Sequence, residues 1–399
     1  MSENKLPESW EVQKLPDIAE FNPESITDAD YEGEQSYVTL SDVSSNTLEN
    51  EPETIDMDDA PSRAQRVVRE DDVLLGKVRP PQESHWRVPE EYDGIVASSG
   101  FTVLRGEHNS IWLVNSILSR EVFRQLDALA IGGGYPAVNN TDLNIVSMPV
   151  PPVGEQERIA SVLYTVDKHV EALDQRHSSL QDLKHALMQD LISPDEDWVE
   201  KKTHEIAKLN PESFSPDEHE EEYLPYLSLS CVSSGQLVDV ESTSVSDPVG
   251  SATRVVREGD ILIGTVRPKQ ESHYLVTHSE DEYIASSGFV VMRPEDIDSE
   301  YLGQVVLSDN FYNQMEAWAT GSTYPTVNLS DVKNMTIPVP PKDEQERIAS
   351  VLYTVDEMIA QTSELRDEYE QAKRGLMQDL LSGKVRTPNS LQPTEAVMA

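Results

Sequence analysis

The sequence predicts an α+β protein made of two copies of one unit, each a strand-rich domain followed by a long helix. Three observations support this fold class. The segment Glu155–Asp167 returns letter for letter as Glu344–Asp356, 189 positions later, and a fixed internal period marks a duplicated architecture. A helix-compatible run follows both copies. Short alternating segments such as Tyr37–Ser41 precede them, a pattern typical of half-buried strands. We expect the two long helices to pack as an antiparallel coiled coil.

The repeat divides the 399 residues into five segments, and a chain of this length favours two to three domains. Each strand-rich domain has an ordinary size of about 150 residues. The last segment is short and contains proline, which favours disorder at a chain end. We predict a first domain over 1–150, a first long helix over 151–195, a second domain over 196–340, a second long helix over 341–386 and a disordered tail over 387–399.

Matched segments predict the same elements, in the same order, inside the two domains. Short β-branched runs that end at Gly and Pro predict buried strands, and one longer run per domain predicts a helical segment. The acidic stretch Glu49–Asp59 has almost no large apolar residue, so we expect an exposed loop there. The matched pairs are, in chain order, 37–41 with 226–230, 66–80 with 254–268, 82–85 with 270–273, 97–101 with 285–289, 111–129 with 299–318, and 134–139 with 323–328.

Both long helices begin at a marked position and carry an apolar seam. Prolines end the preceding element, and Glu155 and Glu157 lie where the positive end of a helix favours acids. Residues 154–192 contain no proline, enough for about 60 Å of helix. Apolar residues recur at three- and four-residue spacing, as in a coiled coil. His177 and Arg366 interrupt the seam at matched places. Two interpretations are open: the stripe slips there, or a polar pair fixes the helix register.

The link between the first helix and the second domain is short, only residues 193–197. Because the chain must turn back at once, the second domain is expected near the far end of the first helix. Antiparallel helices satisfy this requirement and relate the two domains by a pseudo-twofold axis. The helix pair would then act as a spacer of fixed length.

The composition is strongly acidic, with a net charge of −42 from 73 acidic and 31 basic residues. A binder of basic partners and a protein from a very salty cytoplasm are both compatible with this charge. The acids are spread along the chain, which favours halophilic adaptation. At molar salt the Debye length is about 3 Å, so the acidity does not exclude nucleic acid as a partner.

Other functional classes are disfavoured by simple counts. The single cysteine, Cys231, excludes an internal disulfide and a cysteine-cluster metal site. The first residues lack the pattern of a signal peptide. No apolar run approaches the roughly 18 residues needed to cross a bilayer. We therefore expect a soluble, cytoplasmic protein without a membrane partner.

The junction before each long helix carries a family resemblance. Pro149-Val-Pro-Pro152 followed by Glu-Gln-Glu-Arg-Ile-Ala, the later Leu-Met-Gln-Asp-Leu and the element Gly259–Ile263 resemble the specificity subunit of type I restriction–modification systems. The resemblance covers nearly the whole chain, in the right order, twice. It implies two target-recognition domains, each reading one half of a split site in double-stranded DNA. It also implies that the helices set the gap and dock two modification (methyltransferase) subunits, which a restriction subunit joins.

Candidate DNA contacts lie in the matched loops of the two domains. Arginine reads guanine and glutamine reads adenine in the major groove, whereas lysine and hydroxyl groups suit phosphate. For the two arginines that end a strand, base and phosphate contact are equally supported. The predicted contacts are Lys77, Arg79, Gln82, His85, Arg87, Ser98, Ser99, Tyr135 and Asn139 in the first domain, and Arg267, Lys269, Gln270, His273, Ser286, Ser287, Tyr324 and Asn328 in the second.

Structural roles compete with DNA contact at several of these positions. The histidines fit equally a hydrogen-bonded loop residue. The serines are typical of turn capping, and the Tyr-Pro-x-Val-Asn segments fit a tyrosine packed on proline with asparagine capping the next turn. For four further arginines an intradomain ion pair is the favoured role: Arg66, Arg69, Arg254 and Arg257.

The identical first helical turns predict a surface for one kind of partner. Slower drift in tightly packed helices is the alternative explanation. The predicted partner-binding residues are Glu155, Gln156, Arg158 and Ile159, with their counterparts Glu344, Gln345, Arg347 and Ile348.

The sequence does not predict an enzyme. It contains no phosphate-binding loop followed by Lys-Ser/Thr and no histidine spacing suited to a metal. Gly132–Gly134 lacks the strand-then-helix context of a nucleotide loop, and Pro194–Lys202 only superficially matches a nuclease motif. We expect neither cofactor nor metal. The alternative to DNA recognition is a coiled-coil scaffold that pairs two identical protein partners and binds no DNA.

Overall fold

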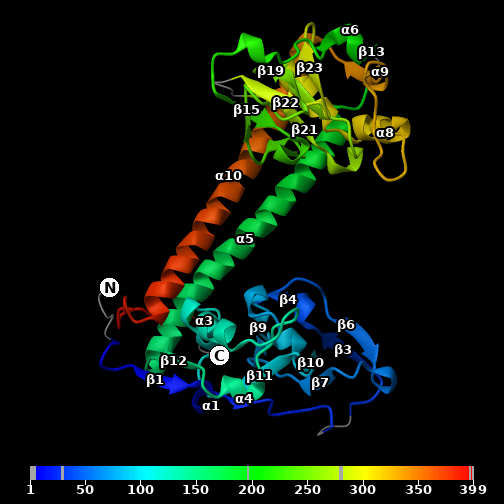
Figure 1. Cartoon of the computed structure of the whole chain (residues 1–399). Coiled ribbons are helices and arrows are strands. Elements are labelled where there is room, and N and C mark those ends of the chain that lie inside the picture. Colours follow the sequence, from blue (N-terminus) through cyan, green and yellow to red (C-terminus); the bar gives the residue numbers. More distant parts are fainter. Residues whose placement is uncertain (1–5, 28–30, 196, 278–281, 395–396, 398–399) are drawn as a thin grey trace. The chain divides into compact units, whose positions relative to one another are not determined.

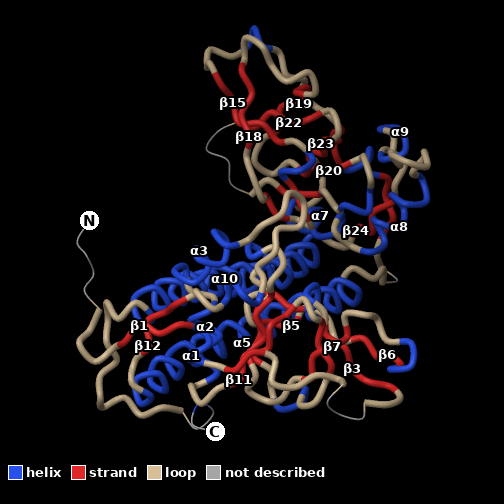
Figure 2. The backbone as a smooth tube through the Cα atoms, turned by 60° about the horizontal axis from the view of Figure 1, so that its bottom comes forward, coloured by secondary structure: helices blue, strands red, loops and turns tan. Residues whose placement is uncertain are grey.

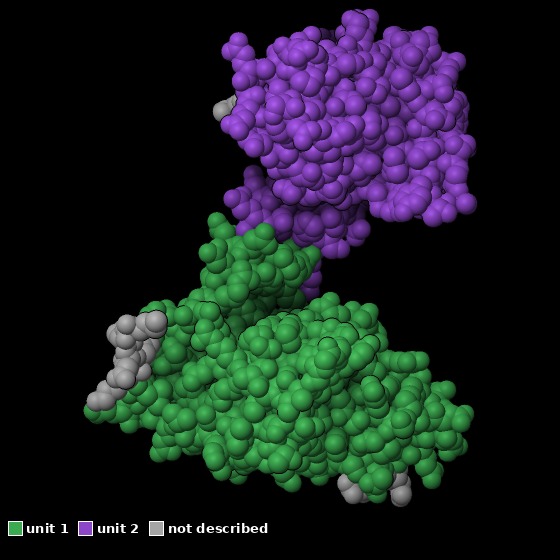
Figure 3. All heavy atoms as spheres, viewed as in Figure 1, with its two compact units in different colours: residues 1–174, 365–399 green, residues 175–364 purple. Residues whose placement is uncertain are grey.

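The computed structural model describes residues 6–27, 31–195, 197–277, 282–394 and 397. The chain forms two units, one from residues 1–174 and 365–399 and the other from residues 175–364 (Figure 3). Each predicted strand-rich domain therefore belongs with half of each long helix. No described helix is both long and apolar enough to cross a membrane.

Among its described residues, the first unit contains two four-stranded sheets and two two-stranded ribbons (Figure 2). The smaller ribbon pairs β4 (Val43–Ser44) with β5 (Thr47–Leu48). In the first sheet only the pairing of β3 with β10 is parallel, and all pairings in the second sheet are antiparallel. The first sheet has the order β6 (Glu53–Asp56), β3 (Glu34–Val38), β10 (Val96–Ser98), β7 (Ala64–Val67); the second has β2 (Glu20–Phe21), β11 (Phe101–Arg105), β8 (Val73–Gly76), β9 (His85–Arg87); the larger ribbon pairs β1 (Glu11–Lys14) with β12 (Ser147–Val150).

Strand β8 is apolar at every position because both of its faces are buried. Val73 and Leu75 face a core shared with the helices, whereas Leu74 faces a second core with Phe101 and Val103. Side chains alternate between the faces of a sheet, so a strand covered on both sides must be apolar at every position.

The acidic stretch 49–59 differs from its predicted loop conformation. Residues Glu53–Asp56 form the edge strand β6, which pairs antiparallel with β3. Backbone hydrogen bonds to β3 hold this strand, together with Ile55, which packs against the buried Tyr37, Ala64 and Val96. Charged side chains on an edge strand also discourage pairing with a further chain.

The second unit repeats this arrangement with the same strand order. Ile261 and Ile263 of β20 face the helix side, and Leu262 faces the second core. The first sheet is β18 (Glu241–Ser244), β15 (Tyr223–Leu227), β22 (Tyr283–Ser286), β19 (Ala252–Val256); the second is β14 (Ala207–Leu209), β23 (Phe289–Pro294), β20 (Ile261–Gly264), β21 (His273–Leu275); the larger ribbon is β13 (Val199–Lys202) with β24 (Thr336–Val339).

The predicted helical segment of each domain is in fact two helices. Ser119 accepts a hydrogen bond from the Val122 backbone N–H and starts the second helix, and Ser308 does the same in the other unit. A serine cap satisfies an orphan N–H at a helix start, so a break becomes stable there. The helices are α2 (Ser110–Ile117) and α3 (Arg120–Leu129), and in the other unit α7 (Ser299–Val306) and α8 (Asp309–Trp318).

The long helices α5 (Val153–Leu191) and α10 (Lys342–Leu381) are each continuous (Figure 1). In the first unit Asp167 pairs with Lys373 and Asp174 pairs with Arg366, each at 2.5 Å. From Asp167 to Asp174 the chain advances by seven residues along α5, and the partner on α10 moves back by seven, from Lys373 to Arg366. The two helices therefore run antiparallel in this unit.

Within the second unit the same direction holds, because Leu180 packs with Val355 and Ile359 while Lys184 pairs with Asp356 at 2.7 Å. The predicted antiparallel packing is confirmed within each unit. At the interruption of the seam, Arg366 takes Asp174 as an interhelical ion-pair partner.

The C-terminal segment differs from the predicted disorder. Thr387 is buried, and its hydroxyl accepts a hydrogen bond from Arg158 Nε at 3.1 Å. Val397 is buried in the core of the first unit. Side chains of α5, distant in sequence, supply the contacts that a short polar tail lacks by itself. Residues 395–396 and 398–399 of the predicted tail lie outside the described residues.

Candidate nucleic-acid interface

A half-buried arginine, Arg79, and an exposed tyrosine, Tyr135, form a pair beyond the end of strand β8. Arg79 donates its backbone N–H to the Pro136 carbonyl at 2.7 Å, and Val78 forms a β-bridge with Ala137. These bonds join the strand continuation to the loop that carries Tyr135. The Arg79 guanidinium carbon therefore lies 4.2 Å from the centre of the Tyr135 ring. Tyr135 is 72% exposed, although it is a large aromatic residue.

The second unit builds the same pair from its own copy. Arg267 donates its backbone N–H to Pro325 at 2.7 Å, and its guanidinium carbon lies 4.5 Å from the ring centre of Tyr324. Tyr324 is 62% exposed. The neighbouring loop residues differ, since Gly133 and Gly134 are replaced by Ser322 and Thr323. The pair is thus retained where its surroundings have diverged.

Both arginines adopt a left-handed backbone conformation, with φ of 50° at Arg79 and 51° at Arg267. This conformation costs a non-glycine residue about 1–2 kcal/mol. An exposed cation–π contact returns only about 0.5–1 kcal/mol. The cation–π contact is therefore too weak to explain why an arginine is found at this strained position. Strained backbone conformations are found most often at functional sites. A guanidinium fork beside an exposed aromatic face suits a base edge or a phosphate.

Lys77 and its counterpart make the two interfaces different. Lys77 is half-buried, and its Nζ donates to Asn140 Oδ1 at 3.0 Å. Burial, with the nearby Arg66 guanidinium adding to it, lowers the pKa of the Lys77 ammonium. At the matched position the second unit has Thr265, whose hydroxyl donates to the Gly288 carbonyl at 2.8 Å. The two interfaces therefore place this cation differently, since the second unit has Lys269 where the first has Pro81.

Two of the four predicted ion-pair arginines are confirmed. Arg69 pairs with Glu24 at 2.9 Å, and Arg257 pairs with Glu212 at 2.7 Å.

The prediction is wrong for Arg66 and Arg254, which have no carboxylate partner within the described residues. The Nε atoms of both are buried without a hydrogen-bond partner there, and burial lowers the pKa of Arg66. Arg66 and Arg254 lie within strands β7 and β19 rather than in the acidic turns that follow. Since Arg66 lies near Lys77, uncompensated positive charge gathers there in a chain of net charge −42. Such charge attracts phosphate.

The predicted DNA contact is wrong for His85 and His273, which are buried. Each ring accepts a backbone N–H at Nδ1, from Gly76 at 3.2 Å and from Gly264 at 3.1 Å. Burial lowers the pKa of each histidine to about 4. The rings are therefore neutral structural acceptors, as in the alternative interpretation, although they lie in strands β9 and β21 rather than in loops.

Three further predicted contacts have structural roles. Arg87 pairs with Asp71 at 2.6 Å and donates to Ser110 at the start of α2, so its guanidinium is used within the domain. The buried hydroxyls of Ser98 and Ser286 each accept a backbone N–H of the following turn at 3.2 Å. Burial makes the DNA-contact prediction wrong for the two serines, for which turn capping is correct, whereas DNA contact by the half-buried Arg87 stays a prediction.

The remaining predicted contacts stay accessible around the arginine–tyrosine pairs. Gln82 and Gln270 are exposed in short 3-10 helices that directly follow the two arginines. Lys269 pairs loosely with Glu316 at 3.5 Å. Ser99 and Ser287 are half-buried and exposed, respectively. Asn139 and Asn328 are exposed N-caps of α4 (Asn140–Leu143) and α9 (Leu329–Val332), which is the capping role of the alternative interpretation.

Comparison with known proteins decides the family. The model of the type I restriction modification DNA specificity domain matches residues 7–181 and again residues 195–371. This chain belongs to that family.

Individual relatives agree with the family assignment over most of the chain. The chain is 22% identical to the type I restriction enzyme MjaVIII specificity subunit of Methanocaldococcus jannaschii, over 96% of this chain and 95% of the relative. Two solved structures share the fold at a TM-score of 0.59. One, from a type I R-M system studied for complex assembly and conformational transition, is 23% identical and covers 96% of this chain and 100% of its own. The other, the type I S subunit from M. genitalium, is 13% identical and covers 96% and 98%.

In this member of the specificity family, four of the predicted partner-binding residues are buried within their own domains. Gln156 and Gln345 are buried, and their side chains donate to the carbonyls of Pro151 at 2.8 Å and Pro340 at 2.9 Å. Ile159 and Ile348 lie in the domain cores. The partner-binding prediction is therefore wrong for these four residues. Packing of the helix start onto its own domain, the alternative explanation, accounts for them.

The predicted partner residues Glu155 and Arg158 contact the C-terminal segment. Glu155 is buried, where it pairs with Arg386 and accepts the Trp10 indole N–H at 2.9 Å. Their counterparts Glu344 and Arg347 pair with each other on the surface of α10. The two copies of one sequence thus have different surroundings.

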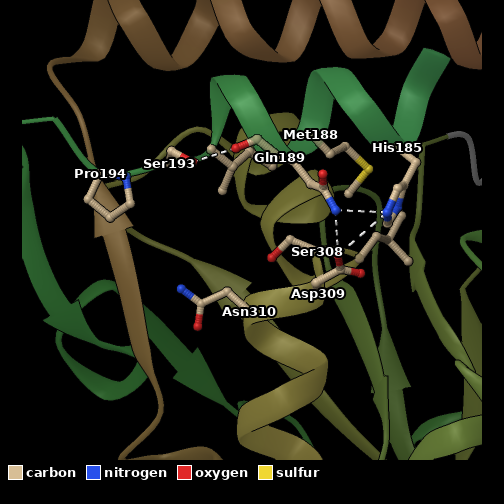
Figure 4. A pocket seen from close by; sticks show the side chains of 10 residues that line it. His185, Met188, Gln189, Ser193, Pro194, Ser308, Asp309 and Asn310 are labelled. Carbon is tan, nitrogen blue, oxygen red and sulfur yellow. Dashed lines mark hydrogen bonds and ion pairs between the residues drawn. The ribbon is translucent and has the colours of Figure 1, made fainter. Parts of the chain in front are cut away.

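A cavity of 280 Å³ lies in the second unit, between the end of α5 and the start of α8 (Figure 4). Its polar side chains satisfy one another, since Gln189 Nε2 donates to Asp309 Oδ2 at 3.1 Å and lies 2.9 Å from His185 Nε2. The cavity includes neither Arg267 nor Tyr324. Among the described residues, no group of histidine, cysteine or carboxylate side chains is arranged to hold a metal ion.

Sequence reasoning named both members of each arginine–tyrosine pair but did not join them. The Arg-Pro and Tyr-Pro dipeptides recur in both copies, 56 positions apart in the first at Arg79 and Tyr135. The recurrence of both dipeptides in both copies is the sequence feature from which the pairing could have been predicted. The β-bridge that brings them together is visible only in the folded chain.

Proposed function

We propose that this chain is the DNA-recognition subunit of a type I restriction–modification complex, with one domain reading each half of a split target. The observation that carries the proposal is the arginine–tyrosine pair, with an exposed tyrosine ring, that each unit presents with the same backbone geometry. The family assignment supports the same function. Two copies of one reading element suit a target with two separated parts.

The proposed chain recognises rather than catalyses, and it needs no cofactor of its own. Two modification subunits supply methyl transfer, and a restriction subunit joins them when cleavage is required. The complex works in the cytoplasm, alongside its DNA. Antiparallel helices α5 and α10 set the gap between half-sites, which fits their continuous length and ion-paired packing.

Footprinting at molar salt, with the modification subunit present, tests the proposal. We expect two protected DNA segments separated by an unprotected gap. Exchanging residues 1–150 for another recognition domain should change one half of the methylated sequence and leave the other half intact. One continuous protected block would contradict a bipartite target. Binding of the modification subunit without DNA selectivity would favour the scaffold alternative.

A further inference from the structure

The same sequence of thirteen residues has two different exposures in this chain. Residues 155–167 and 344–356 are identical, and both begin a long helix against a similar domain. Ser161 is buried, whereas its counterpart Ser350 is exposed. Arg158 is half-buried, whereas Arg347 has a side chain that is 58% exposed. Sequence cannot cause this difference, so a neighbouring segment must.

The neighbouring segment in the first unit is the C-terminal segment, residues 386–394. Arg386 Nη2 lies 2.6 Å from the Glu155 carboxylate. The Arg158 guanidinium donates to the Thr387 hydroxyl at 3.1 Å and to Asn389 Oδ1 at 3.2 Å.

Further along, Ser161 bonds to the Thr394 hydroxyl at 3.1 Å. The bound segment thus offers one arginine, then hydroxyl and amide groups, in an order that matches successive turns of α5.

Among the described residues of the second unit, the same helix side chains have no such cover. Glu344 and Arg347 pair only with each other in the described structure, at 2.5 Å. Val351 is 37% exposed. An exposed ion pair contributes little stability, so its two members are available to a better partner. We call Glu344, Arg347, Ser350 and Val351 the α10 face.

We propose that the α10 face binds an extended segment of a protein partner that carries an arginine followed by hydroxyl and amide side chains. The chain's own residues 386–394 occupy the equivalent face of α5 and close it to that partner. That the partner is a subunit of the restriction–modification complex rests on the proposed function; because one face is closed, this face binds a single copy and is separate from the surfaces that dock the two modification subunits. That the α10 face binds such a peptide does not depend on the proposed function.

Charge and tethering both support this assignment. The first turn of α10 carries Asp343 and Glu344, which attract a basic segment. On α5 the competing segment is tethered, and a short tether gives an effective concentration in the millimolar range. A free segment at micromolar concentration therefore binds α10 and does not displace the tail from α5. The two faces of one duplicated sequence become non-equivalent docking positions.

A labelled synthetic peptide with the sequence of residues 384–399 tests the proposal by titration of the full-length chain. We expect one peptide bound per chain, and two per chain after truncation behind Gly383. Arg347→Ala should weaken binding to the full-length chain by about tenfold or more, because two charge-assisted hydrogen bonds are lost. Arg158→Ala should remove only the second site of the truncated chain. Arg374→Ala, an exposed arginine elsewhere on α10, is the matched control and should change nothing.

Three outcomes would overturn the proposal. In the first, the full-length chain binds no peptide while the truncated chain binds one. In the second, Arg347→Ala leaves peptide binding unchanged. In the third, sedimentation shows a dimer that disappears on truncation, which assigns the face to a second copy of the chain. None of these measurements involves DNA. A failure of the footprinting experiment would therefore leave this test intact, and the reverse also holds.

Discussion

Arg79 and Arg267 combine a half-buried side chain, stacked on an exposed tyrosine, with a backbone conformation that favours glycine. The guanidinium group gains a tyrosine face, yet that contact and the backbone strain are of similar size, about 1 kcal/mol each. A residue whose side chain contributes nothing net to folding can still be required for binding. Buried residues such as His85 show the opposite case, since their polar atoms are used inside the domain.

Replacing Arg79 by glycine separates these two contributions. We expect Arg79→Gly to leave the free energy of unfolding within about 1 kcal/mol, because relief of strain offsets the lost cation–π contact. DNA affinity should fall by about tenfold to a hundredfold, the value of one arginine contact to a base. Chemical unfolding and DNA titration measure the two quantities. Arg120→Ala, an exposed arginine of α3, is the control, and an equal loss of affinity there would contradict the assignment.

His85 and His273 predict a dependence of stability on pH. Their pKa is about 4 in the folded chain, below the ordinary 6.5. The unfolded chain therefore binds more protons between these values, and stability falls as the pH drops from about 6.5 to about 4. The full effect is on the order of 3 kcal/mol for each histidine.

Chemical unfolding at pH 7 and pH 5 measures this loss. The variant with His85→Gln and His273→Gln keeps an acceptor for the glycine N–H and should lose much less stability over this range. An unchanged slope in the variant would refute the role assigned to the histidines.

At the scale of elements, α5 and α10 are joined by ion pairs of unequal burial. Lys184 is 16% exposed and shares Asp356 with Gln304, which donates to the same carboxylate at 2.8 Å. Arg366 and Asp174 are 36% and 51% exposed. Water and salt screen the second pair more than the first. The two pairs should therefore differ in their contribution to the helix packing.

Removing one carboxylate at a time tests this difference. Asp356→Ala should destabilise by roughly 1–3 kcal/mol, because it leaves a half-buried ammonium and a buried amide without an acceptor. Asp174→Ala should cost about 1 kcal/mol or less. Chemical unfolding of both variants beside the unsubstituted chain gives the comparison. Equal losses would show that burial does not control these pairs.

For the whole molecule the dominant property is the net charge of −42. Like charges repel in the folded chain, and salt shortens the range of that repulsion from about 10 Å at 0.1 M to about 3 Å at 1 M. Ion pairs at the surface weaken in salt too. They are few beside the surplus of acids, so relief of repulsion is the larger effect.

The chain should therefore be more stable in concentrated salt. We expect the midpoint of thermal unfolding to rise steadily between 0.1 M and several molar KCl. Circular dichroism measures the transition, and sucrose at matched osmolality is the control for effects unrelated to charge. A midpoint that is constant or falls with KCl would contradict the halophilic interpretation of the composition.

The sequence by itself determined the duplication, the extent of both long helices, their antiparallel packing and the family. These properties depend on periodicity, on prolines at helix starts and on the short link between copies, all of which are local features. The pairing of Arg79 with Tyr135 was outside its reach, because a β-bridge between segments distant in sequence creates it.

Only the tertiary structure decided which copy of an identical side chain is exposed. Glu155 and Glu344 have the same sequence neighbours, and one is buried against Arg386 while the other lies at the surface. The burial of His85 and the lack of a carboxylate beside Arg66 among the described residues are of the same kind. Exposure depends on what else packs nearby. In this chain the deciding segment follows Glu155 by more than two hundred residues.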